Sequence, residues 1–148
     1  MRVMVMVKAT KKSEAGVHPG DPGFDKLVEE MGKFNDELVK AGVILAADGL
    51  HPSSRGKRVR VSASGEKRTV IDGPFTETKE LVAGFWIWKV KSMDEAVQWV
   101  KKCPNPMESE SDIEIRPMYT AEDFAPVDPT GELRANEQKL RDSVAKKK

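Results

Sequence analysis

Apolar residues recur along the chain with two different spacings, and these spacings predict an alternation of strands and helices. The unbroken apolar run from Val3 to Val7 predicts a strand that is buried on both faces. Residues 24–39 carry apolar side chains at steps of three and four, which predicts an amphipathic helix ending at Gly42. Residues 43–50 then predict a second strand.

The second half of the chain repeats this order after a hairpin. Residues 58–63 and 67–72 predict the two strands of that hairpin. Residues 83–90 form the most strand-like run of the sequence, residues 92–102 predict a second amphipathic helix, and residues 113–117 predict a last strand. The segment between the first strand and the first helix is rich in Gly and Pro, so we expect residues 10–23 to form a loop.

This order of elements predicts an α+β fold. Two βαβ halves with an inserted hairpin correspond to a ferredoxin-like sandwich, βαββαβ, in which right-handed crossovers place both helices on one face of the sheet. Along residues 83–90 the side chains of Phe85 and Ile87 lie on one side and those of Trp86 and Trp88 on the other. Because a monomer would leave one of these apolar faces in water, we expect a homodimer with a pocket.

The composition changes after Phe124, which predicts two parts: a domain over residues 1–124, and a linker with a helical tail over residues 125–148. Residues 131–148 are polar and carry only a thin apolar stripe, so we expect a helix that frays, docks weakly or docks on a partner subunit.

Charge and cysteine content narrow the classes of partner. The 148 residues have a net charge of +1, with 33% charged residues, which gives no reason to expect nucleic acid or an anionic membrane as the main partner. The apolar start is shorter than the roughly 7–15 residues of a secretory signal. Cys103 is the single cysteine, so no internal disulfide can form, and we expect a cytoplasmic protein.

The corner Asp72-Gly73-Pro74 is the first candidate for chemistry. In one interpretation Asp72 forms a turn in which its carboxylate accepts backbone N–H groups, and Gly73 adopts a positive φ. In the other, Asp72 is a pocket carboxylate that acts as a base, with His51 as the acid or orienting group. The two interpretations can both hold, and the sequence does not show whether His51 and Asp72 meet.

Further candidate ligand-binding residues surround this corner and the strand that follows it. Trp86 and Trp88 can be core or interface aromatics, or an aromatic wall for a flat ligand. Arg116 can form an ion pair with Glu114 or contribute to a pocket. The other candidates lie in the charged segment after the corner and are Glu77 and Lys79.

The motifs of nucleotide, zinc and redox sites are absent from the sequence. The two histidines, His18 and His51, each precede a proline in a loop, and Cys103 lies at a helix end, where a structural role is favoured over that of a nucleophile. We therefore expect no metal and no cofactor.

The run from Asp72 to Glu80, DGPFTETKE, resembles the motif of the DGPF proteins, which belong to the YCII-related family of the dimeric α/β-barrel superfamily. The segments around Leu50-His51-Pro52, Gly84-Phe85-Trp86 and Ile113 to Pro117 agree with it, and the resemblance covers residues 1–124.

The resemblance implies a ferredoxin-like fold, a homodimer and a pocket between sheet and helix, but no settled activity. A related branch is enzymatic and uses a His–Asp pair whose histidine falls near Met31 here. The helix around Met31 contains no histidine, so that pair does not carry over.

We therefore expect a homodimer that binds an unidentified small molecule, with or without lyase or isomerase chemistry through proton transfer by Asp72. The sequence leaves open whether the protein is an enzyme. The alternative is a non-catalytic regulator or partner linked to an extracytoplasmic-function sigma factor, which the resemblance suggests.

Overall fold

A computed structural model describes residues 1–16 and 18–147. Val17, inside the predicted loop, and Lys148, at the end of the predicted tail helix, lie outside the described residues. Contacts between Cα atoms divide the chain into two compact units, Met1–Pro117 and Met118–Lys148. The boundary that the sequence places after residue 124 stays a prediction.

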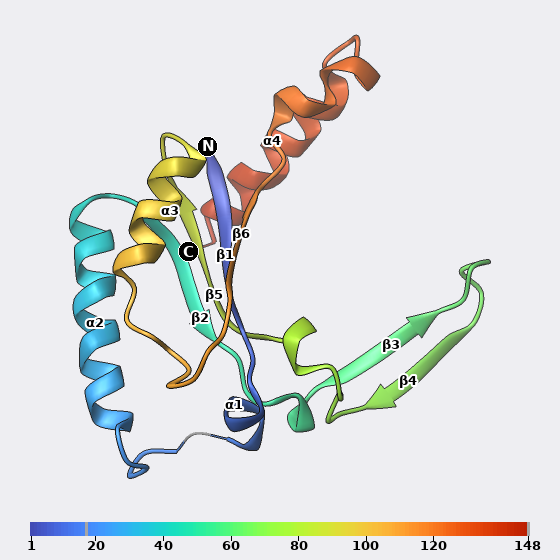
Figure 1. The fold of residues 1–148 in the computed structure, drawn as a ribbon. Helices are drawn as coiled ribbons and strands as arrows, with labels where there is room; N and C mark the ends of the chain where they lie inside the picture. Colours follow the sequence, from blue (N-terminus) through green and yellow to red (C-terminus); the bar gives the residue numbers. More distant parts are fainter. Residues whose placement is uncertain (17, 148) are drawn as a thin grey trace. The chain divides into compact units, whose positions relative to one another are not determined.

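The first unit is built on an antiparallel sheet with the strand order β2-β5-β1-β6 (Figure 1). Every neighbouring pair of strands is antiparallel. The two central strands are β1, the first strand of the chain, and β5, the strand with the most aromatic residues. Their bounds are Arg2–Lys8 for β1, Ile44–Gly49 for β2, Val82–Lys89 for β5 and Ile113–Pro117 for β6. An α+β fold is therefore confirmed, and in the described residues the strands form open sheets rather than a closed barrel.

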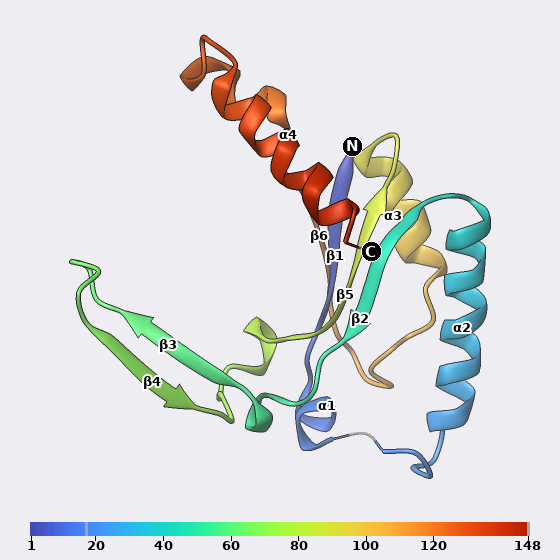
Figure 2. The same ribbon diagram turned by 180° about the vertical axis from the view of Figure 1, so that it is seen from behind.

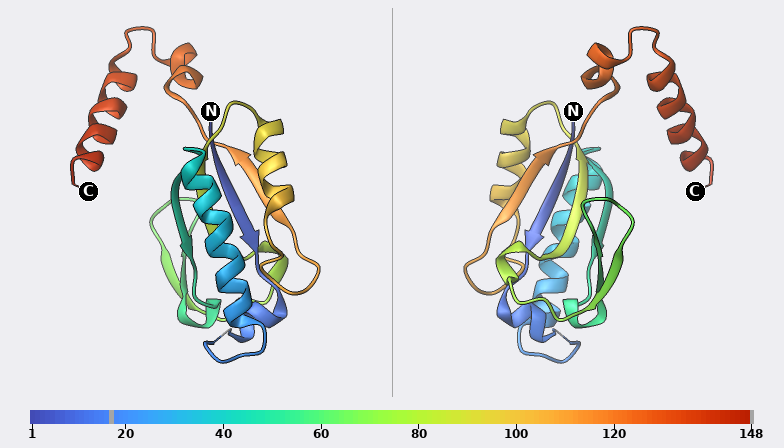
Figure 3. Two further views of the ribbon diagram at one scale, coloured as in Figure 1. Left: turned by 90° about the vertical axis from the view of Figure 1, so that its left-hand side faces the viewer. Right: turned by 90° about the vertical axis from the view of Figure 1, so that its right-hand side faces the viewer.

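Two helices, α2 (Phe24–Lys40) and α3 (Met93–Lys102), cover one face of this sheet and lie side by side (Figure 3). The N–H of Gly42 donates to the carbonyl of Val39, and the N–H of Val43 donates to that of Leu38. With φ +67 at Gly42, these bonds form a Schellman motif, and Gly42 is the helix terminator that the sequence predicts. Ser92 caps α3 by accepting from the N–H of Glu95.

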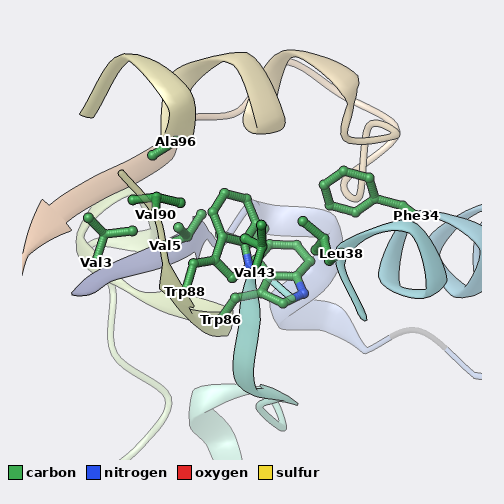
Figure 4. Packing of buried hydrophobic residues seen from close by; sticks show 10 residues of the cluster. Val3, Val5, Phe34, Leu38, Val43, Trp86, Trp88, Val90 and Ala96 are labelled. Atoms are coloured by element: carbon green, nitrogen blue, oxygen red, sulfur yellow. The ribbon is translucent and has the colours of Figure 1, made fainter. Parts of the chain in front are cut away.

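The hydrophobic core lies between the sheet and these helices (Figure 4). Trp86 and Trp88 lie side by side, with ring centroids 5.8 Å apart, and Phe34 of α2 meets both rings edge-on. The other buried members come from β1, from both helices and from the positions next to β2 and β5; they are Val3, Val5, Val7, Leu38, Val43, Val90 and Ala96. Trp86 and Trp88 therefore pack under the helices, as core residues.

No helix among the described residues of this unit covers the opposite face of the sheet. Along β1, burial alternates, so that Val3, Val5 and Val7 are buried while Met4 and Met6 are only half-buried. The prediction of a strand buried on both faces is thus wrong for the isolated chain, because both helices lie on the valine side. We call the uncovered surface the open sheet face; its apolar members are Met4, Met6, Ala46, Phe85 and Ile87.

The predicted hairpin is present and pairs β3 (Lys57–Val61) with β4 (Arg68–Asp72) as a separate two-stranded sheet. It extends from the end of the main sheet, on the side away from α2 and α3 (Figures 1 and 2). Gly65 has φ +79 in the turn between the strands, which favours glycine at this position.

Short helices interrupt segments that the sequence pattern predicts as loops. Lys11–Ala15 forms α1, with a capping box between Thr10 and Ser13. One-turn 3-10 helices occur at Ser53–Arg55 (η1) and Thr78–Glu80 (η2). Helices this short bury too few residues to leave an apolar period in the sequence.

The second unit contains a 3-10 helix, η3 (Ala121–Val127), followed by α4 (Glu132–Ala145), which lies in the range where the sequence predicts a helical tail. Asp128, 3% exposed, joins them: its carboxylate accepts from the backbone N–H groups of Leu133 and Arg134 and from the Arg134 guanidinium. None of the described helices of either unit has the length and apolar character needed to cross a membrane.

Candidate functional site

A cavity of about 380 Å³ lies between α2 and the sheet, and we call it the α2 pocket. Its walls come from α2, from the end of β2, from the first half of β5 and from the loop after α3. The lining is mostly apolar: Val7, Met31, Asn35, Ala47, Asp48, Gly49, Ala83, Gly84, Phe85, Trp86, Pro106 and Met107. Such a lining suits an apolar or aromatic group.

Asn35 is the polar group that α2 contributes to this wall. The indole N–H of Trp86 donates to the Asn35 Oδ1 at 2.9 Å, which satisfies a buried donor and holds the ring in place. Met31 lies one turn before Asn35 and lines the same pocket. The position where the related enzymatic branch implies a histidine is thus at the pocket, but it carries a thioether without acid–base chemistry.

A second cavity, of about 350 Å³, adjoins the first, and we call it the α1 pocket. The two cavities have four lining residues in common, Gly49, Ala83, Pro106 and Met107. The α1 pocket is more polar at one end, where Ser13, Glu14 and His51 contribute to its wall. Together the pockets offer an apolar compartment next to one with hydrogen-bonding groups.

Glu14 anchors the loop that forms this polar end. Its carboxylate accepts from the backbone N–H of Ser53, 3.1 Å from each oxygen, and from the Ser53 hydroxyl. The Ser53 Oγ in turn accepts from the N–H of Phe75 at 3.0 Å. The DGPF corner is therefore joined through Ser53 to the wall of the α1 pocket.

Gly73 makes the closest approach at this corner. A Cβ atom at Gly73 would lie 1.7 Å from the carbonyl oxygen of Ser53, so no larger residue fits without a backbone shift. Gly73 is not among the glycines with positive φ, so space, and not a left-handed conformation, requires glycine here. The Gly73–Pro74 peptide bond is cis.

Asp72 lies at the end of β4, directly opposite Lys57, and its carboxylate forms an ion pair with the Lys57 ammonium. The expected turn, with backbone N–H groups donating to this carboxylate, is not what the structure has. The Gly73 N–H donates instead to the carbonyl of Gly56, and Pro74 has no N–H. The Asp72 side chain is 74% exposed and does not contribute to either pocket within the described chain.

The other predicted site residues are spread over the unit. His51 lines the α1 pocket, and its ring nitrogens lie 3.2 Å from the Arg55 Nη1. Lys79 lines a separate polar cavity of about 390 Å³, formed with residues 8–11 and 109–112. Glu77 is exposed just before η2.

The last two predicted site residues, Trp88 and Arg116, differ sharply in burial. Trp88 is 0% exposed, and its indole N–H has no hydrogen-bond partner in the described part of the chain. Arg116 is exposed beside the open sheet face, with its Nε 3.9 Å from a Glu114 carboxylate oxygen. The structure therefore brings Trp86 and His51 to adjoining pockets and leaves the other predicted residues elsewhere.

Cys103 is partly buried at the end of α3, and burial raises the pKa of its thiol to about 11. The thiol therefore stays protonated at neutral pH, which suits a structural role rather than that of a nucleophile. Among the described residues, no three His, Cys, Asp or Glu side chains gather where they could hold a metal ion.

Sequence reasoning missed Asn35, Glu14 and Ser53. Asn35 leaves a readable signal, because it follows Met31 by four positions and precedes Leu38 by three, so it interrupts the apolar face of α2 with an amide. Glu14 and Ser53 leave none, since 39 positions separate them and neither lies in a periodic segment.

An open antiparallel sheet, helices on one face only and a pocket under the first long helix define this chain as a small α+β protein with one uncovered sheet face. The chain belongs to the YCII-related family, because the model described as YCII-related domain matches residues 1–132. A relative in Rhizobium meliloti (strain 1021), described as an uncharacterized protein, is 30% identical over 94 residues, which are 64% of this chain and 74% of the relative.

Proposed function

We propose that the protein binds a small molecule across the α2 and α1 pockets. The observation that carries the proposal is the Trp86 ring, held by the Asn35 amide in the wall of a mostly apolar cavity. Ligand sites are usually concave and apolar with a few fixed polar groups, and their volumes are roughly 300–1,000 Å³. Both pockets fall in this range.

The two compartments suggest the chemistry of the ligand. An aromatic or other apolar body fits the α2 pocket beside Trp86 and Met31. A polar end that can donate hydrogen bonds fits the α1 pocket, because Glu14 supplies carboxylate oxygens there and His51 supplies a ring nitrogen. The ligand class is therefore a small aromatic molecule with a polar substituent.

We further propose that two chains pair through their open sheet faces as a ferredoxin-like, dimeric α/β barrel. The apolar centre of this face, with Met4, Phe85 and Ile87, favours burial against an identical surface. Charged residues at its edges, among them Lys8, Glu114 and Arg116, suit the rim of an interface.

Proton transfer by Asp72 stays a prediction. The exposed ion pair with Lys57 gives no support to a buried base, so the geometry favours binding over catalysis as the function to test first.

Ligand binding is tested by titrating the protein with a library of small aromatic acids, amines and phenols while tryptophan fluorescence is recorded. Asn35→Ala removes the partner of the Trp86 indole, so we expect at least about tenfold weaker binding, equivalent to about 1.4 kcal/mol. Asp72→Ala is the matched control and should bind as the wild type does, because Asp72 lies outside both pockets.

Two results would contradict the proposal that the ligand binds in the α2 and α1 pockets. One is the absence of any saturable fluorescence change over the library. The other is the reverse pattern, in which Asp72→Ala abolishes binding and Asn35→Ala leaves it intact, because the ligand would then sit at the corner. Thermal unfolding of both variants shows whether a loss of binding reflects a loss of folded protein.

A further inference from the structure

The hairpin of β3 and β4, residues 57–72, is an unusually exposed element, and we call it the arm. Ile71 is half-buried, and every other residue of its two strands is exposed. Val59, Val61 and Val70 are 56%, 53% and 62% exposed. An isolated two-stranded hairpin is at best marginally stable in water, so an arm with this composition gains from a covering surface.

The exposed valines of the arm share one face. Val59 and Val70 are directly opposite each other in the register, and Val61 follows two positions after Val59, so the three side chains point the same way. Arg58 and Arg60 point the other way, and the Arg58 guanidinium stacks 3.9 Å from the centre of the Phe75 ring at the base of the arm. One face is thus anchored to the DGPF corner, while the valine face is free.

The arm and the open sheet face lie on the same side of the main sheet. Both ribbon views show α2 and α3 on one side of the sheet and the arm on the other (Figures 1 and 2). The Gly73 N–H bond to Gly56 and the Phe75 N–H bond to Ser53 fix the base of the arm in this direction. A chain that covers the open sheet face would therefore meet the arm.

The net charge of the arm is opposite in sign to the net charge of the rest of its unit. Residues 57–72 contain five Lys and Arg against two Asp and Glu, a net charge of +3. The remainder of residues 1–117 contains fourteen basic and sixteen acidic residues, a net charge of −2. The body of a second copy therefore carries a net charge opposite in sign to that of the arm, and the symmetry of a dimer makes the contact mutual.

We propose that the arm is a dimerisation element that packs its valine face on a second copy of the chain. The proposal rests on the pairing of the open sheet faces and adds a second, separate contact: each arm reaches past the paired sheets and lies against the body of the other copy. This contact gives an isologous interface, in which the arm of each copy contacts the same surface of the other.

The first experiment asks whether the arm touches another copy. Unlabelled and ¹⁵N-labelled protein are mixed in equal amounts, unfolded and refolded together, and cross-linked with a carbodiimide, which joins Lys57 and Lys67 to nearby carboxylates. If the arm lies on a second copy, about half of the arm cross-links to residues outside the arm join one light and one heavy peptide, as random pairing requires. Cross-links that stay within one isotope overturn the proposal.

The second experiment measures what the arm contributes to dimerisation. In Val59→Ser/Val61→Ser/Val70→Ser the dissociation constant of the dimer, measured by analytical ultracentrifugation, should rise at least about tenfold. The matched control is Val28→Ser/Val39→Ser, which changes two comparably exposed valines on the outer side of α2 and should leave the constant unchanged. Far-UV circular dichroism reports whether the main sheet and helices remain folded.

The outcomes separate this proposal from the ones it builds on. A monomeric wild type overturns sheet pairing and the arm contact together. A dimer that the triple variant does not weaken, without light–heavy arm cross-links, overturns the arm contact alone. If the wild type instead binds a labelled DNA duplex that the triple variant does not bind, while dimerisation is unchanged, the arm is a nucleic-acid ribbon and the proposal is wrong. Ligand titration of the triple variant reports on the pockets independently.

Discussion

Gly73 and Ser53 show how a short sequence motif acts through a distant loop. The corner is held by two hydrogen bonds that backbone N–H groups donate, from Gly73 to the carbonyl of Gly56 and from Phe75 to the hydroxyl of Ser53. The Ser53 carbonyl occupies the space in which a side chain of residue 73 would begin. The glycine of the motif is thus explained by close approach, and the corner positions the loop of His51 and Ser53.

We predict that Gly73→Ala lowers the free energy of unfolding by about 3 kcal/mol, because the added Cβ collides with a backbone carbonyl that cannot rotate away. Urea unfolding followed by circular dichroism measures the change. Gly32→Ala, in an exposed part of α2 where no atom lies within 4 Å of the new Cβ, should stabilise by roughly 0.5–1 kcal/mol. Equal effects of the two substitutions would contradict the close approach.

Asp72 illustrates why the type of a residue does not by itself determine which contacts its side chain makes. An Asp before Gly and Pro is typical of a turn, in which the side chain accepts from the backbone N–H groups that follow. Here the Gly73 N–H already donates to the carbonyl of Gly56, seventeen positions earlier, and the Asp72 carboxylate forms an ion pair with Lys57 across the hairpin. Both partners come from the pairing of β3 with β4, a non-local contact.

At the scale of elements, the long helices could be predicted closely and the short ones could not. The apolar spacing and Gly42 placed α2, yet its apolar residues Val28 and Val39 are exposed. Only Phe34 and Leu38 of this helix are buried, and Met31 and Asn35 are partly buried beside them. The helix α1 escaped prediction because five residues hold less than two turns of any apolar period.

The junction of η3 and α4 depends on the charge of one carboxylate. Burial alone would raise the pKa of Asp128, but the backbone N–H groups of Arg134 and Leu133, together with the Arg134 guanidinium, outweigh it and hold the pKa below its ordinary value. A carboxylate with a lowered pKa stabilises the folded form above its unfolded pKa of about 3.9, and this contribution disappears as the pH falls through the folded value.

We therefore predict that the helix content of the C-terminal unit falls below about pH 4, in the window beneath the unfolded pKa of Asp128. Backbone NMR shifts of residues 132–145 measure this loss in the full chain. Asp128→Asn should reduce the helicity of α4 already at pH 7 and make it less dependent on pH. Unchanged shifts in that variant would show that Asp128 does not hold the junction. A regulatory partner for this unit stays a prediction.

At the scale of the whole molecule, the two faces of the main sheet differ in what covers them. The helices cover the side of Trp86 and Trp88 and leave Phe85 and Ile87 on the other, so the first unit has a core on one side and an apolar surface on the opposite side. This asymmetry follows from right-handed crossovers, which place both helices on the same face.

We predict that Ile87→Glu raises the dissociation constant of the proposed homodimer at least about 100-fold, because an unpaired carboxylate would be buried between two sheets. Size-exclusion chromatography with light scattering over a range of protein concentrations measures the change. Val39→Glu, on the exposed side of α2, is the control and should leave the assembly unchanged. A dimer that persists in Ile87→Glu would place the interface elsewhere.

The sequence by itself determined the order of the strands and long helices, the α+β class and the family, because each depends on local periodicity or on a contiguous motif. It also indicated that residues 83–90 have two apolar faces. Only the tertiary structure decided that Trp86 lies on the pocket side with Asn35, that Glu14 and Ser53 support the corner, and that Asp72 pairs with Lys57. These contacts join residues 15 to 51 positions apart, and no local pattern specifies which distant side chain will fill a given space.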